Sequence, residues 1–405
     1  MVWTGRAMCG ADDPASAGGN LYLDSAASEA ADPDVIKAML PYMLQEYANP
    51  SSVHAQGKAA AASLRKAKSE IASHLGARAG EVIITSGGTE SDNLAIKGIA
   101  MGMAGGDASQ VSRTDIVISA IEHPAVRESA YWLERHFGFR VREAPVDAGA
   151  RIDLSRLREM VGARTALVSV MLANNEVGTI QPIREVASIA HSCGAVMHTD
   201  AVQAAGLIPI SMADLGVDAM SLSGHKFGTP KGIGALLLRS SLPYEALISG
   251  GGQEEGLRSG TENVAAAVGM AVALRKSLKS LESRNPLLRD SAHALCEAVN
   301  RVVPDAILTG DRKHRLPGHV SLVFPGISGE ALLVELDVLG ISCSSGSACA
   351  VGRTEASPTL LAMGFGTDMA KSSLRMTFRH VLNATEIAAI AGRLRDSVSA
   401  LTALA

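Results

Sequence analysis

Residues 219–238, AMSLSGHKFGTPKGIGALLL, decide how this chain folds. The segment opens with the apolar run Ala219–Leu222, turns at residues 223–226 (SGHK) and continues into a second apolar run, Gly234–Leu238. Short runs that are apolar on both faces are typical of strands buried in a mainly parallel sheet. The polar turn then lies at the end of a buried strand, in a region where α/β sheets bind ligands.

The same pattern extends toward the N-terminus. Further strands are predicted at Val82–Thr85, Asp115–Ser119, Ala166–Met171 and Ala195–Thr199. Helical stretches lie between the strands, for example Ser91–Ala100 and Ile183–His191. This alternation of strands and helices predicts an α/β layered domain.

The C-terminal third has a different pattern, which predicts a smaller α+β domain. Its predicted strands and helices are His319–Phe324, Ser373–Phe378, Glu330–Leu339 and Thr385–Leu404. Asn383 and Glu386 have the spacing of a capping box for the last helix. A long helix over Val272–Ala298 is expected to connect the two domains, with a break or kink at Pro286.

Length and composition set the broad class. The chain has 405 residues, and one core stops growing near about 250–300 residues, so two domains are expected. The hydrophobic share of 47% and the charged share of 19% are typical of a soluble globular protein. A net charge of −4 gives no footprint for nucleic acid or an anionic membrane. No apolar run approaches the roughly 18 residues of a spanning helix, so no membrane partner is expected.

The N-terminus and the cysteines indicate a compartment. Residues 1–19 are rich in small and polar residues and lack the basic start and apolar run of a secretory signal, so we expect a disordered leader. Five cysteines, an odd number without a framework spacing, argue against a disulfide scaffold. A reducing cytoplasm fits this cysteine content best.

Two strand ends carry candidate binding groups. Residues 86–90 (SGGTE) follow a strand and open a helix, where bare backbone N–H groups can cradle a phosphate, although an ordinary tight turn is the alternative. Alternation points His198 and Asp200 to the same side of the next candidate strand end. Asp200 could stabilise a protonated ring nitrogen there, or simply cap a helix. Gln203, about one turn later, could hydrogen-bond a phenolic oxygen.

A lysine and a cysteine are the candidate reactive groups. Lys226 lies beside small residues and near other cationic groups, where a lysine loses its proton readily and forms a Schiff base. A solvated loop lysine is the alternative. Cys349 lies in the segment 343–357 (CSSGSACAVGRTEAS), where a partly exposed thiol can act as a nucleophile. A small buried hydrophobe is the alternative, and it suits Cys343 better.

Together, and in this order, these motifs resemble the cysteine desulfurases of the NifS/IscS-like group. That group belongs to the class V aminotransferase family of fold type I enzymes, which use pyridoxal 5'-phosphate (PLP). The resemblance covers nearly the whole chain, from residue 22 to about residue 400. Its most specific matches are SGGTESDNLAIKG from Ser86, ANNEVG from Ala173, HTDAVQ from His198, SGHKFGTPKGIGAL from Ser223, RSGTEN from Arg258 and SSGSAC from Ser344.

The resemblance implies a domain organisation. A large PLP-binding domain with a mainly parallel seven-stranded sheet would span residues 35–275. A smaller α+β domain would span residues 276–405 and carry the catalytic cysteine in the loop 343–357. The N-terminal segment 20–34 would pack with the smaller domain.

The resemblance also assigns roles to individual residues, and it calls for no metal. The cofactor phosphate would be held by Gly88, Thr89, Ser223 and His225, and by Thr261 of the partner subunit in an obligate homodimer. The cofactor ring would be contacted by His123 on its face, Asp200 at its nitrogen, Gln203 at its hydroxyl, and Asn175, which would also reach the substrate. Lys226 would bind PLP covalently, and Arg375 would clamp the substrate carboxylate with its planar fork.

The reaction that the resemblance implies removes sulfur from L-cysteine. PLP would act as the electron sink, Lys226 would move the α-proton, and His123 would assist. Cys349 would take the sulfur as a persulfide, leaving L-alanine, and pass it to a protein acceptor in iron–sulfur cluster assembly or a thiolation pathway such as that of tRNA. Two alternatives remain open: another fold type I PLP enzyme, such as a selenocysteine lyase or an aminotransferase, and a non-catalytic sulfur-relay scaffold.

Overall fold

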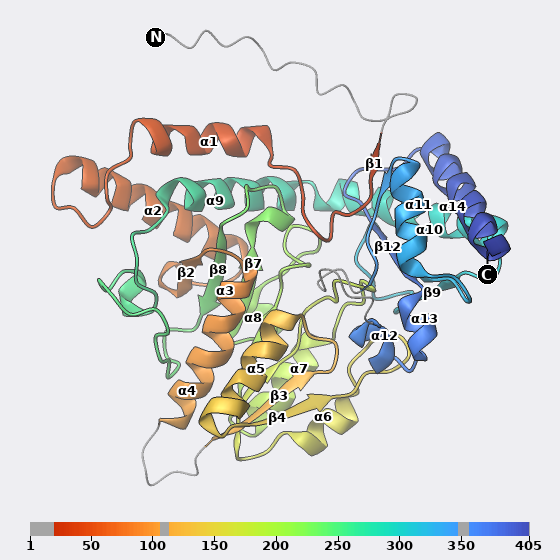
Figure 1. Ribbon diagram of the computed structural model, residues 1–405. Coiled ribbons are helices and arrows are strands. Elements are labelled where there is room, and N and C mark those ends of the chain that lie inside the picture. The colour runs from red at the N-terminus through yellow and green to blue at the C-terminus, as the bar shows by residue number, and fades with distance from the viewer. Residues whose placement is uncertain (1–19, 106–112, 347–355, 405) are drawn as a thin grey trace.

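The computed structural model describes residues 20–105, 113–346 and 356–404 (Figure 1). The predicted leader, residues 1–19, and the central part of the predicted cysteine loop, including Cys349, lie outside the described residues.

A seven-stranded sheet forms the centre of the larger part of the molecule (Figure 1). Its strands, in spatial order, are β2 (Val82–Thr85), β8 (Gly234–Leu238), β7 (Ala219–Ser223), β6 (Val196–Asp200), β5 (Thr165–Ser169), β3 (Asp115–Ser119) and β4 (Arg140–Ala144). Only β8 pairs antiparallel, with β2 and with β7. The other pairs are parallel, which confirms the predicted fold class.

Six of these strands were predicted, with ends that differ by at most two residues. The seventh, β4, was not predicted. Its sequence, RVREA, has no apolar run, because β4 is the edge strand and only its last residue is buried. An edge strand carries a weaker hydrophobic signal than a strand that is covered on both faces.

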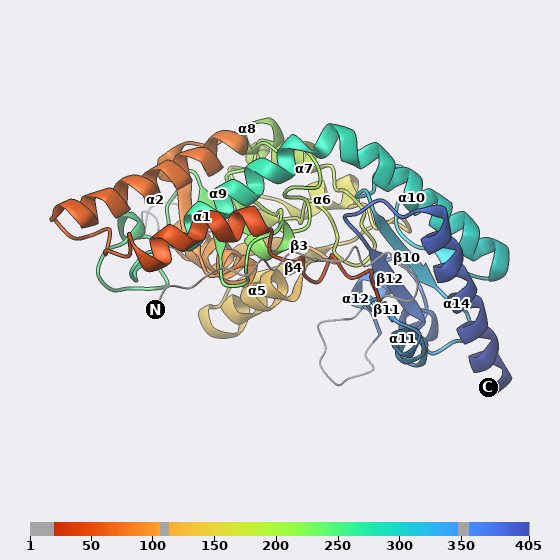
Figure 2. The same ribbon diagram turned by 90° about the horizontal axis from the view of Figure 1, so that it is seen from above.

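Helices cover both faces of the seven-stranded sheet (Figure 2). One face packs against α2 (Ala55–His74), α7 (Ile183–Ser192) and α9 (Val264–Lys279). The other face packs against α5 (Pro124–Phe137), α4 (Ile99–Ala104) and the π-helical turn η2 (Leu94–Gly98) that follows α3 (Gly88–Asn93). Successive side chains of β2 point to opposite faces of the sheet. Ile83 packs on the face covered by α4 and α5, and Ile84 packs on the face covered by α2, α7 and α9.

A further apolar cluster, separate from those on the two faces of the large sheet, lies around a small antiparallel sheet, β12-β10-β9. These strands are β9 (Ile307–Leu308), β10 (His319–Val323) and β12 (Ser373–Thr377), and α10 (Leu281–Val302), α11 (Gly329–Val338) and α14 (Ala384–Leu404) pack around them. The N-terminal strand β1 (Leu21–Tyr22) pairs with β11 (Ile341–Ser342) beside this sheet. The domain boundaries given above stay predictions.

The remaining helices are short, apart from α1. They are α1 (Pro33–Leu44), η1 (Ala79–Glu81), α6 (Leu154–Met160), α8 (Met212–Leu215), η3 (Gly224–Lys226), η4 (Glu254–Gly256), α12 (Pro358–Ala362) and α13 (Thr367–Lys371). Among the described residues, no helix combines the length and apolar content needed to cross a membrane.

The connection between the large sheet and the small antiparallel sheet differs from the prediction. Two helices, α9 and α10, arch across the molecule, and the break between them lies at Ser280 (Figure 2). Pro286 lies inside α10, so the predicted break at this proline was wrong. The helix breaks instead at Ser280, six residues before this proline.

Candidate active site

A cavity of about 240 Å³ lies at the carboxyl ends of β6 and β7. Its lining residues are Ala26, Ala27, Gly88, Thr89, Asp92, His123, Met171, Asn175, Asp200, Val202, Gln203, Ser223, His225, Lys226 and Arg375. The structure therefore brings together all but two of the predicted site residues. Cys349 lies outside the described residues, and Thr261 is exposed and does not line this cavity.

The turn between β2 and α3 forms one wall of the cavity. A Cβ atom on Gly88 would come within 2.8 Å of Cγ2 of Val202, so a side chain does not fit there without a shift. Glu90 fixes the turn, because its carboxylate accepts a hydrogen bond of 2.8 Å from Ser86 N and pairs with Arg258 at 2.7 Å. The turn therefore presents bare backbone at the start of a helix, as a phosphate site requires.

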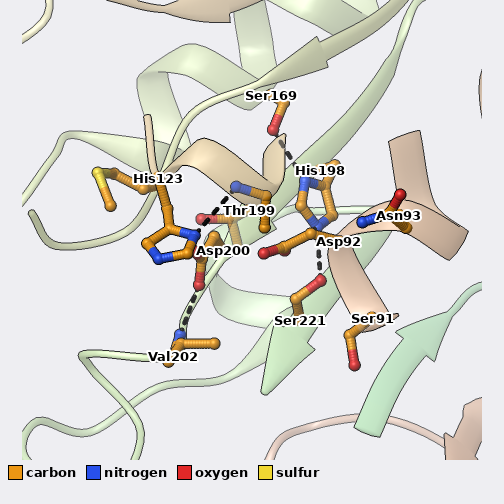
Figure 3. Close-up of polar contacts among 12 residues, drawn as sticks. Ser91, Asp92, Asn93, His123, Ser169, His198, Thr199, Asp200, Val202 and Ser221 are labelled. Atoms are coloured by element: carbon orange, nitrogen blue, oxygen red, sulfur yellow. Dashed lines mark hydrogen bonds and ion pairs between the residues drawn. The ribbon is translucent and has the colours of Figure 1, made fainter. Parts of the chain in front are cut away.

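Asp200 and His123 face the cavity from β6 and from the start of α5 (Figure 3). Burial raises the pKa of Asp200, and the charges of His123 and Lys226 act in the opposite direction. Burial lowers the pKa of His123, so its ring is neutral at pH 7. Nδ1 of His123 accepts a hydrogen bond of 3.1 Å from Ala125 N, which places the ring proton on Nε2.

Lys226 reaches the cavity from the turn after β7. Its Nζ donates hydrogen bonds to the carbonyl oxygens of Ala26 at 2.6 Å and Ala27 at 2.8 Å. Those residues belong to the N-terminal segment, about 200 positions earlier in the chain. The turn itself requires a glycine, because a Cβ atom on Gly224 would lie 2.4 Å from Oγ1 of Thr229.

Arg375 enters the cavity from the small sheet, and its side chain is 3% exposed. Its Nη2 lies 2.7 Å from Oδ1 of Asp24, and its Nη1 donates a hydrogen bond of 3.1 Å to the carbonyl of Asn175. Its Nε has no hydrogen-bond partner among the described residues. One donor of a buried guanidinium is therefore left for a further acceptor.

The described ends of the predicted cysteine loop are anchored beside Arg375. Backbone hydrogen bonds join Ser344 to Arg375, and Gly346 N donates to Oγ of Ser373 at 3.0 Å. At the other end, Ser357 and Thr359 both donate to the buried carboxylate of Glu176. Both ends of the loop thus lie at the edge of the cavity.

Cys343 is a poor candidate for a nucleophile. Burial raises the pKa of its thiol to about 12, so the thiol is protonated at neutral pH. This supports the interpretation of Cys343 as a small packed side chain.

Three carboxyl groups at or beside the cavity were not predicted from the sequence, namely Asp24, Asp92 and Glu176. Asp92 follows Gly88 by four residues, a spacing that places both on one side of a helix, so it could have been found. Asp24 and Glu176 act on Arg375 and on the loop ends across long stretches of chain, and no local pattern signals such contacts.

Comparisons with known proteins agree with this arrangement. The profile of the family described as aminotransferase class-V matches residues 21–390. The chain is 45% identical to an "IscS-like cysteine desulfurase" of Mycobacterium tuberculosis over 362 residues, which cover 89% of this chain and 91% of that protein. It is 41% identical to a "cysteine desulfurase" of Cereibacter sphaeroides over 385 residues, which cover 95% and 97%.

Solved structures show the same fold. A structure described as "NIFS-LIKE PROTEIN" has a TM-score of 0.86 and 33% identity, over 94% of this chain and 100% of that chain. A structure described as DndA from Streptomyces lividans has a TM-score of 0.72 and 34% identity, over 88% and 99%.

Proposed function

Because the chain belongs to the aminotransferase class-V family, we propose that it is a PLP-dependent cysteine desulfurase that converts L-cysteine to L-alanine and a protein-bound persulfide. Two relatives at 41–45% identity are named cysteine desulfurase, and the similarity covers nearly their whole length. The observation that carries the proposal is the shared cavity of Gly88, Asp200, Lys226 and Arg375, beside which both ends of the Cys349 loop are anchored.

The cavity fits PLP in shape and charge. Gly88 leaves bare backbone for a phosphate, at a point that a Cβ atom would block. Asp200 is a buried carboxyl whose ionised form would be stabilised by a cationic ring nitrogen. Lys226 lines the same cavity. The residues proposed to hold the cofactor are Gly88, Thr89, His123, Asn175, Asp200, Gln203, Ser223, His225 and Lys226, with Thr261 of the partner subunit.

Bound PLP would withdraw electrons from the α-carbon of the substrate. The amine of Lys226 is the proposed base that takes the α-proton and returns it later. His123 is neutral, because burial lowers its pKa, and it can assist this proton transfer through Nε2. Arg375, which lines the cavity, is proposed to bind the substrate carboxylate with its guanidinium and so to orient the molecule.

Cys349 is proposed to receive the sulfur. Its thiolate attacks the sulfur of L-cysteine, and the carbon–sulfur bond breaks with its electrons going to the substrate carbon. That carbon takes up a proton, L-alanine leaves, and the sulfur remains as a persulfide on Cys349. The hydrogen bonds between Ser344 and Arg375, at one described end of the segment that carries Cys349, support this role.

Two substitutions test the proposal. We expect Lys226→Ala to abolish the visible absorbance of lysine-linked PLP together with all sulfide release. We expect Cys349→Ala to keep the absorbance, to form no persulfide, and to release sulfide on the order of a hundredfold more slowly or worse. Cys343→Ala is the control and should retain activity, since its thiol is protonated.

Two outcomes would contradict the proposal. Sulfide release at the parent rate by Cys349→Ala would instead favour another fold type I enzyme, such as a selenocysteine lyase. A parent protein that stays colourless after reconstitution with PLP would favour a relay scaffold without catalysis.

We further propose that the protein works as a homodimer in a reducing cytoplasm and passes its sulfur to a protein acceptor. The acceptor pathway, iron–sulfur cluster assembly or a thiolation pathway, would be identified from the proteins recovered with the persulfidated form.

A further inference from the structure

Asp92 is a buried carboxyl with no role in the mechanism above. It lies on α3, is 1% exposed and lines the cavity together with Asp200. Its Oδ1 has no hydrogen-bond partner among the described residues. An unpaired buried carboxylate is costly, so its protonation state needs a physical explanation.

A row of polar side chains crosses three strands behind Asp92 (Figure 3). His198 lies in the middle, with Nδ1 at 2.8 Å from Oγ of Ser169 and Nε2 at 2.9 Å from Oγ of Ser221. Oδ1 of Asp92 lies 3.8 Å from the same Nε2, which is beyond a hydrogen bond. The hydroxyl of Ser221 lowers the pKa of the Asp92 carboxyl.

This row does not supply a positive charge. His198 is fully buried, and burial lowers its pKa to about 3, so the ring is neutral at pH 7. Neutral donors such as Ser221 stabilise a carboxylate less than an ionised partner does. The row can therefore orient Asp92 without ionising it.

The titratable groups that raise the pKa of Asp92 are other carboxyls, and burial raises the pKa of one of them, Glu122, as well. Asp200 from β6 and Glu122 from the turn before α5 both raise the pKa of Asp92, after the larger effect of burial. Lys226 lines the same cavity, and its charge lowers the pKa of Asp200. Carboxyl groups that share a dry site do not all ionise, because their repulsion is not screened by water.

We propose that Asp92 is held as a neutral carboxylic acid beneath the cofactor site, so that Asp200 alone supplies the negative charge opposite the PLP ring nitrogen. The inference rests on the proposed function and names a positioning residue for it. Ser169, His198 and Ser221 fix the orientation of this acid. A second negative charge would overcompensate the ring nitrogen and weaken the electron withdrawal on which the chemistry depends.

The test measures the unfolding equilibrium of the holoprotein in urea as a function of pH, for the parent and for Asp92→Asn. A neutral Asp92 has a folded pKa above its unfolded value, so the parent loses stability as pH rises through the window between these two values. The amide of the variant does not titrate. The parent unfolding constant, divided by that of Asp92→Asn, should therefore rise by up to about tenfold per pH unit as the pH increases above the unfolded pKa of an aspartate, about 3.9.

The visible spectrum gives an independent measurement. Asp92→Asn keeps the charge of the site, so the absorbance of bound PLP and the pH at which it titrates should match those of the parent. Asp200→Asn is the matched control at the other carboxyl and should shift both. Asp92→Ser, which does not titrate either, gives the same pH slope if the asparagine variant does not fold.

A ratio of unfolding constants that stays flat with pH would overturn the inference, because it means that Asp92 is ionised in the folded protein. A shifted PLP titration in Asp92→Asn would overturn it as well. If the parent takes up no PLP, the proposed function fails, yet the pH slope still decides the protonation state of Asp92.

Discussion

At the scale of single residues, Gly88 shows how one missing side chain defines a binding site. A Cβ atom there would come within 2.8 Å of Cγ2 of Val202 and 3.4 Å of Cβ of Ser223. Both neighbours line the proposed PLP cavity, so a side chain would fill space that a phosphate needs. The requirement for glycine at this position is steric.

We expect Gly88→Ala to weaken PLP binding by roughly tenfold or more, which corresponds to at least about 1.4 kcal/mol. Fluorescence titration of the apoprotein with PLP measures the effect. Val202→Ala in the same chain should restore part of the affinity, because it removes the nearest contact atom.

Gly392→Ala is the matched control for this prediction. A Cβ atom on Gly392 meets nothing within 4 Å, and the residue lies inside α14. This substitution should leave PLP affinity unchanged and slightly stabilise the fold. Equal affinity in the parent and in Gly88→Ala would show that the turn does not hold the phosphate.

At the scale of elements, the predicted capping box of α14 is confirmed. Asn383 N donates to Oε2 of Glu386 at 2.8 Å, and Glu386 N donates to Oδ1 of Asn383 at 3.0 Å. The two side chains thus satisfy two backbone donors at the helix start. Because these contacts are local, the three-residue spacing was enough to predict them.

Asn383→Ala should lower the free energy of unfolding by about 1 kcal/mol, since the backbone N–H of Glu386 loses its side-chain acceptor. Urea denaturation followed by circular dichroism measures this. Asn383→Ser keeps an acceptor and should retain most of the stability. If serine and alanine cost the same, the cap does not contribute as the geometry indicates.

At the scale of the whole molecule, Thr261 bears on the proposed dimer. It is exposed on its own chain and does not line its own cavity. If it contacts a PLP phosphate at all, that phosphate belongs to another subunit. The proposed function therefore requires a dimer for a complete phosphate site.

Mixed dimers test this requirement. One chain carries Lys226→Ala and the other carries Thr261→Ala, each with a different affinity tag. We expect the mixed dimer to bind one lysine-linked PLP with the parent affinity. The chain that carries Thr261→Ala keeps its own Lys226, and its partner chain supplies an intact Thr261 to that site. The Thr261→Ala homodimer should bind PLP more weakly, and equally weak binding by the mixed dimer would place Thr261 in its own site.

The sequence by itself determined the strands of the buried sheet, the helix cap and the motifs that carry Lys226, Asp200 and Gly88. Each of these follows from neighbours within a few residues, through apolar runs, alternation or turn chemistry. It did not predict the edge strand β4, and it placed the break of the connecting helix at Pro286 instead of Ser280.

Only the tertiary structure decided which distant groups share the cavity. Arg375 meets Asp24 across 351 positions, and Lys226 meets Ala26 across 200. Asp92 and Asp200 line the same cavity because α3 packs against β7 and β8, next to the strand that carries Asp200. Protonation states depend on burial and on such long-range neighbours, so they cannot be predicted from the local sequence.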